Sequence, residues 1–172
     1  MEVIIIVVLV AFIIYRATRK KRPRRSRSAS PRTGADAYRR YMAKHIPELL
    51  SKFSVFEPSY LSRLSAYFLH NGSVPPFRDD EVQAGVERGR ASWTLNHCMR
   101  LASARYSNSK SISDAKKGEA DYISLNVSRG CQGCRKVPQS KKYAPGERIP
   151  LYPCADCKED NICQIWYKAE YK

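Results

Sequence analysis

The chain has 172 residues, which suits one domain of ordinary size and excludes a mini-protein that depends on disulfides for its stability. Lys and Arg number 31 against 16 Asp and Glu, and the formal net charge of +15 favours an anionic partner, lipid or nucleic acid. With 43% hydrophobic and 27% charged residues, the chain is neither wholly disordered nor a protein with many membrane spans.

An uncharged apolar segment occupies residues 3–15, and a dense run of cations follows it. A signal peptide would carry its cations before the apolar segment, and a buried core segment is the structural alternative, because 13 helical residues rise only ~20 Å. Eleven Val, Ile, Leu and Phe side chains nevertheless favour membrane insertion by about 3 to 7 kcal/mol. We expect residues 1–17 to form a single-pass transmembrane anchor. The N-terminus would lie outside and the remainder in the cytoplasm, because Lys and Arg stay on the cytoplasmic side.

Residues 18–35 are rich in Arg, Ser and Pro and contain no large apolar side chain, which predicts a disordered basic linker. Its cations would bind anionic membrane lipid at ~1 kcal/mol each when close to the surface. Nucleic-acid binding by this arm and a role limited to fixing the membrane topology are the alternatives. The candidate membrane-surface residues are Arg19, Lys20, Lys21, Arg22, Arg24, Arg25 and Arg27.

Residues 36–108 show the periodicity of a helical region. Asp36 is the expected N-cap, and apolar residues recur at helical spacing as far as Phe53, with Pro47 expected to divide the segment into two helices. A further helix is predicted from Pro58 to the turn at residues 71–72.

A third helix is expected to begin at Asp79 and Asp80 and to continue to about Tyr106. Its predicted apolar face carries Val82, Val86, Trp93, His97 and Leu101. The polar residues 107–118 then predict a flexible connection.

His97 and Cys98 are the candidates for an enzymatic function, as base and nucleophile. Adjacent helical residues point about 100° apart, so this pair is poorly arranged for catalysis. We expect both side chains to pack in a helical core.

Residues 122–127 alternate between apolar and polar side chains, which predicts a strand, and residues 162–167 predict a second strand that pairs with it.

Two C-x-x-C pairs, Cys131 with Cys134 and Cys154 with Cys157, are separated by nineteen residues, a spacing typical of zinc sites. Each pair forms a turn that directs two thiolates to one point, and two turns complete a tetrahedron with Zn–S bonds of ~2.3 Å. The spacing over residues 128–171 resembles that of zinc ribbons and related knuckle modules. Cys163 is an alternative fourth ligand in place of Cys154.

Iron–sulfur ligation and disulfide bonds are the alternatives for these cysteines, although disulfides are rare in the cytoplasm. The predicted ligand set is all cysteine, with no His close by in the sequence, whereas catalytic zinc sites keep an open position and often use a His or a carboxylate. We therefore expect structural Zn²⁺.

The sequence thus predicts an α+β protein with four parts: a transmembrane anchor (1–17), a basic disordered linker (18–35), a helical region (36–108) and a zinc-stabilised, zinc-ribbon-like β module (109–172). The expected function is a membrane-anchored, cytosol-facing zinc-binding scaffold or adaptor that binds a protein partner and has no catalytic activity. A membrane-associated nucleic-acid-binding protein is the alternative, followed by an enzyme that uses Cys98 or His97.

Overall fold

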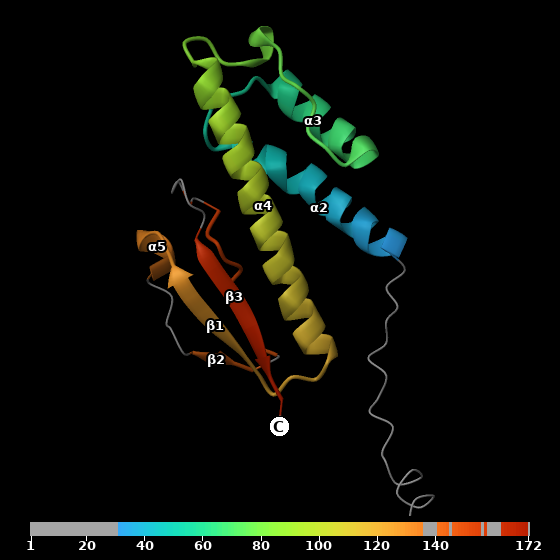
Figure 1. Cartoon of the computed structure of the whole chain (residues 1–172), viewed down its shortest axis with the longest axis vertical. Helices are drawn as coiled ribbons and strands as arrows, with labels where there is room; N and C mark the ends of the chain where they lie inside the picture. Colours follow the sequence, from blue (N-terminus) through green and yellow to red (C-terminus); the bar gives the residue numbers. More distant parts are fainter. Residues whose placement is uncertain (1–30, 136–140, 145, 156, 158–162, 172) are drawn as a thin grey trace, which may run out of the picture. The chain divides into compact units, whose positions relative to one another are not determined.

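The computed structural model describes residues 31–135, 141–144, 146–155, 157 and 163–171 (Figure 1). The chain divides into two compact units, residues 1–34 and 35–172. The second unit combines helices with a small antiparallel sheet, which confirms the predicted α+β class. The predicted anchor at residues 1–17 and the linker cations at residues 19–27 lie outside the described residues. Within the described part of the chain, none of the helices has the length and apolar character needed to cross a membrane.

Helix α2 extends from Pro31 to Ser51 without interruption, and two predictions about this segment are wrong. The helix begins before Asp36, so the last five residues of the predicted linker are helical. Pro47 lies inside the helix and does not divide it. A proline removes one backbone hydrogen bond, and here the side chains around it, Ile46 and Leu49 among them, are buried in the core. Packing of this apolar face therefore maintains the helix through the proline.

Helix α3 (Pro58–Asn71) confirms the prediction at both ends. Gly72 follows it with φ of 71°, a left-handed conformation that glycine adopts without strain, and its amide donates to the Phe68 carbonyl at 2.8 Å. Tyr60, Leu64 and Phe68 form the buried face of this helix.

Helix α4 (Arg88–Lys117) begins later and ends later than the sequence predicts. Asp79–Glu81 form only a short 3₁₀ helix, η1, and Val82 pairs in an isolated bridge with Phe56 instead of lying on α4. Gly85 has φ of 81°, which is incompatible with a continuous right-handed helix.

The C-terminal part of α4 replaces the flexible connection predicted over residues 107–118. Asn108 is buried, and its Nδ2 donates to the carbonyl oxygens of Tyr152 and Ile165, both at 2.8 Å. These bonds hold a polar segment against the sheet region, so helix α4 continues across the boundary predicted between residues 108 and 109.

The sheet has the order β2-β1-β3, with β1 (Tyr122–Arg129), β2 (Lys142–Tyr143) and β3 (Gln164–Glu170) all antiparallel. The predicted pairing of the two longer strands is confirmed. The buried side chains of one sheet face, Ile123, Leu125, Ile165 and Tyr167, belong to the hydrophobic core. Strand β3 lies along α4, and α2 and α3 lie on the other side of this helix (Figure 1).

Candidate metal centre

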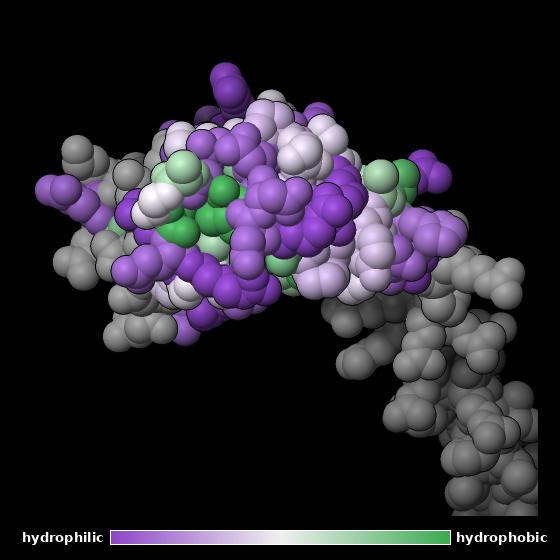
Figure 2. Space-filling view, turned by 90° about the horizontal axis from the view of Figure 1, so that it is seen from above, coloured by the Kyte–Doolittle hydropathy of each residue, from purple (hydrophilic) through white to green (hydrophobic). Residues whose placement is uncertain are grey.

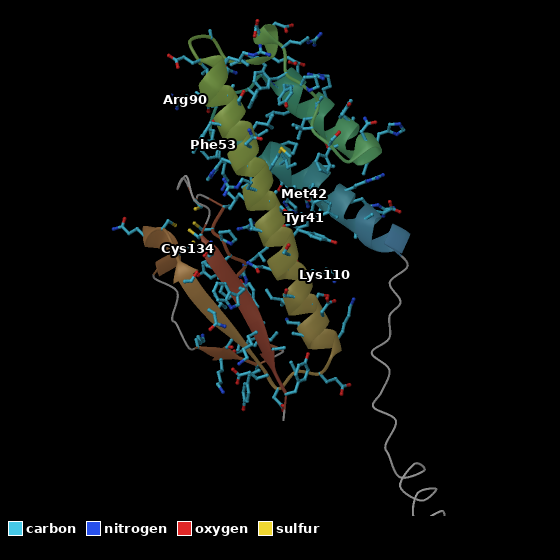
Figure 3. The ribbon with its side chains drawn as sticks, in the orientation of Figure 1. Tyr41, Met42, Phe53, Arg90, Lys110 and Cys134 are labelled. Carbon is cyan, nitrogen blue, oxygen red and sulfur yellow. The ribbon has the colours of Figure 1, made fainter. Side chains whose placement is uncertain are left out.

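Five cysteines meet at one end of the sheet. Cys131 follows β1, Cys134 lies in the short helix α5 (Gln132–Arg135), and Cys163 immediately precedes β3. Cys154 and Cys157 come from the loop that precedes Cys163 in the sequence. Sulfur atoms gather near the labelled Cys134, beside α4 (Figure 3).

The thiols form two sets of three, and Cys131 belongs to both. In one set Cys131 joins Cys134 and Cys154; in the other it joins Cys157 and Cys163, with the sulfur atoms of each set within 4.8 Å of one another. The Sγ–Sγ distances are 3.6 Å from Cys131 to Cys154 and 3.3 Å from Cys157 to Cys163. A tetrahedron with Zn–S bonds of ~2.3 Å has edges of about 3.8 Å, so the cluster is close to the size that a metal ion requires.

Backbone amides direct hydrogen bonds to three of the sulfur atoms. The Cys131 amide donates to Cys163 Sγ at 3.0 Å, the Cys134 amide to Cys131 Sγ and the Cys154 amide to Cys134 Sγ, both at 3.4 Å. Hydrogen bonds of this kind stabilise the thiolate form that binds metal. The turns thus supply donors as well as ligands.

The thiols differ in their proton affinity. Burial opposes ionisation of Cys131, but hydrogen bonds from the Cys134 amide and from neighbouring thiols outweigh it and lower its pKa to about 7. Burial raises the pKa of Cys134 and of Cys154, and it raises the pKa of Cys163 to about 12. Metal binding at this site would therefore release protons.

The structure brings together all five cysteines that the sequence predicts as ligands or alternatives. Cys154 and Cys163 each belong to one set of three. The choice between them as fourth ligand stays a prediction, as does the identity of the metal.

His97 contacts this centre from α4, although the sequence indicates only helical packing for it. Its Nε2 lies 2.6 Å from the carbonyl oxygen of Cys157, and because a carbonyl only accepts, the imidazole carries its proton on Nε2. The ring is buried, stacked on Trp93 at 4.9 Å and in edge contact with Phe53 at 6.0 Å. Sixty residues separate His97 from Cys157, so no local pattern could have revealed this contact.

Cys98 lies apart from the cluster and is fully buried, as expected for helix packing. Burial raises the pKa of its thiol to about 12, which disfavours the thiolate that a nucleophile requires.

No protein family matches this sequence, and neither a curated protein nor a solved structure was found that resembles it. Function therefore has to be argued from the geometry of the chain itself.

Proposed function

We propose that this chain is a membrane-anchored scaffold or adaptor with a cytoplasmic, zinc-stabilised binding module and no catalytic activity. The observation that carries the proposal is the clustering of five cysteine thiols at one end of the sheet, in two sets of three that share Cys131. Soft thiolate ligands in this arrangement favour Zn²⁺, and iron–sulfur clusters are the main competitor.

The role of the metal would be structural. The ligands come from the end of β1, from α5 and from the loop before β3, so one ion would join segments that are distant in the sequence. Zinc binding to such modules contributes an apparent free energy of roughly 10 to 16 kcal/mol, and the small sheet has little core of its own. All-sulfur coordination also leaves no position for a reacting water.

The membrane location rests on sequence alone. The apolar residues 3–15 and the cations of the linker support an anchor with anionic lipid at its cytoplasmic side. A protein partner would then meet the module close to the membrane.

The test is the metal content of the full-length chain, purified in mild detergent and measured by elemental analysis. We expect about one zinc per chain. Cys131→Ser should lose it, because Cys131 belongs to both sets of thiols. Cys98→Ser is the matched control and should retain it, and comparison of Cys154→Ser with Cys163→Ser identifies the fourth ligand.

Two results would contradict the zinc proposal. One is a metal-free chain whose thiols are all blocked under non-reducing conditions, which would mean disulfides. The other is stoichiometric iron with visible absorption, which would mean an iron–sulfur cluster.

A further inference from the structure

The sheet has a second side, which faces away from the buried core. Antiparallel pairing places directly opposed residues on the same side, and the register joins Asn126 to Trp166 and places Ser124 between Lys142 and Lys168. We call this side the open face. It comprises Tyr122, Ser124, Asn126, Lys142, Trp166, Lys168 and Glu170.

Trp166 is the prominent apolar group of this face, with 48% of its surface exposed. It lines a hollow of about 390 Å³ on the open face, together with Ser124, Asn126 and Ser128. It also borders a second hollow of about 600 Å³ beside α4, where Arg100, Ser103 and Gln164 are among the lining residues. An exposed indole is therefore flanked by two concave surfaces. The first is lined largely by hydroxyl, amide and cationic groups, whereas the second is more apolar, with Ala104 and Ile165 beside the cation Arg100.

The charge around Trp166 is positive. Among the residues that the structure describes, Glu170 is the one carboxylate that lines either hollow, and it pairs with Lys142 at 2.7 Å. Within the described residues, neither Lys168 nor Arg100 takes part in an ion pair. The two cations leave the surroundings of the indole complementary to an anion. In the view from above, hydrophilic residues cover most of the coloured surface, and hydrophobic residues show between them in more than one place (Figure 2).

We propose that the open face, together with the adjoining hollow beside α4, binds single-stranded nucleic acid. Trp166 stacks on an unpaired base, Lys168 and Arg100 contact phosphates, and Asn126 and the neighbouring hydroxyls bond to base edges. A single strand fits because a base is free to stack on a side chain only when it is released from a duplex. A protein partner fits the first hollow less well, because the centre of a protein interface is depleted in Lys, whereas Lys142 and Lys168 both line this hollow.

This inference rests on the proposed function, since the cysteine cluster holds the start of β3. Cys163 directly precedes Gln164, the first residue of the strand that carries Trp166. Metal at the cluster would therefore fix the position of the indole relative to β1.

The test uses the full-length chain in detergent and a fluorescent twelve-nucleotide oligouridine, with binding followed by anisotropy at physiological salt. Trp166→Leu should weaken binding about tenfold or more, because it removes the stacking ring and keeps an apolar side chain. Trp166→Phe should retain most of the affinity, because phenylalanine keeps a ring that stacks on a base. Tyr67→Leu is the matched control, since Tyr67 is an aromatic residue, 38% exposed, that lies on α3 and lines neither hollow. Lys168→Ala should lower the slope of log affinity against log salt by about one.

Wild-type affinity in Trp166→Leu would overturn the inference, and so would equal binding of a duplex of the same length, which would reveal charge attraction alone. Retrieval of a protein that requires Trp166, with no oligonucleotide binding, would also overturn it. Zinc content measured on the same samples separates the two proposals. If the chain holds one zinc but does not bind the oligonucleotide, only this inference is refuted. If a metal-free chain binds the oligonucleotide, the zinc module is refuted instead.

Discussion

Glu81 is a buried carboxylate that two arginines hold in place. Arg63 donates from Nε to Oε1 at 2.8 Å and from Nη2 to Oε2 at 2.6 Å, and the Arg78 amide donates to Oε2 at 2.9 Å. The side chain is only 2% exposed, whereas its neighbour Asp80 is 74% exposed. The acidic residues 79–81 were expected to start a helix, and one of them instead joins η1 to α3.

The Glu81 network predicts a stability that depends on pH. Chiefly through the hydrogen bond from Arg63, the pKa of this carboxyl falls from 4.5 to about 2. A lowered pKa means that the stabilisation is complete above pH 4.5 and is lost as the pH falls towards 2. We expect Glu81→Gln to lower the free energy of unfolding by about 3 to 4 kcal/mol at pH 7, at ~1.4 kcal/mol per tenfold change in proton affinity.

Urea denaturation of the full-length chain in detergent at pH 7 and at pH 3 measures this effect. The difference between wild type and Glu81→Gln should shrink at pH 3, and Asp80→Asn should behave as wild type at both values. A difference that stays constant with pH would show that packing, and not the carboxylate charge, is responsible.

Among the helices and strands, the sequence predicted correctly those elements whose ends or burial depend on neighbouring residues in the chain. Helix α3 has a proline at its start and a left-handed glycine after its end, and both signals are visible in the sequence. The alternation in β1 correctly predicted that Ile123 and Leu125 lie in the core, although Ser124 between them is buried as well. The cysteine spacing likewise predicted the cluster of thiols, and Cys131 and Cys134 of the first C-x-x-C pair do share one set of three, whereas Cys154 and Cys157 of the second pair belong to different sets.

Distant contacts decided the elements that were predicted wrongly. The end of α4 is polar in composition, and it remains helical because Asn108 bonds to Tyr152 and Ile165 and because Ala115 is buried in the core. Pro47 is tolerated because the face of α2 around it is buried, with Tyr41 of the same helix 5.2 Å from Tyr106 of α4 between ring centroids. Figure 3 shows Tyr41 on the side of α2 that is directed towards α4. Burial of this kind depends on tertiary partners that no short sequence window contains.

The contact between α4 and the metal centre predicts a role for His97 in zinc affinity. In His97→Phe the ring can still stack on Trp93, but the Cys157 carbonyl loses its donor. Loss of a supporting hydrogen bond near a metal typically costs 10- to 100-fold in affinity, and we expect the lower part of that range because the bond reaches a ligand's backbone.

Competition with a chromophoric zinc chelator measures this affinity in the full-length chain. His97→Gln retains a donor and should lie between Phe and wild type, and His70→Ala, at an exposed residue of α3, should match wild type. Equal affinities for His97→Phe and wild type would show that α4 supports the centre by packing alone.

For the whole molecule, charge is distributed unevenly along the chain. Nine Lys and Arg residues lie within residues 16–32, and Glu2 is the one acidic residue before Asp36. Subtracting them from the totals of 31 and 16 leaves 22 basic and 15 acidic residues, so residues 36–172 carry only +7 of the +15. More than half of the excess charge therefore lies next to the apolar segment, where it would set the orientation of the proposed anchor and would attract anionic lipid.

This distribution predicts the orientation of the chain in a membrane. A reporter fused after Lys172 should be cytoplasmic, and the protein should resist carbonate extraction, because the cations next to the apolar segment stay on the cytoplasmic side.

Replacing Arg22, Arg24, Arg25 and Arg27 with Gln should place part of the reporter on the outer side. The same change at Lys116 and Lys117 should have no effect, since only charges within about 20 residues of the span count. Release by carbonate of a chain shortened at its N-terminus would contradict the anchor and favour a cleaved signal peptide, because cleavage removes the apolar segment together with the membrane attachment.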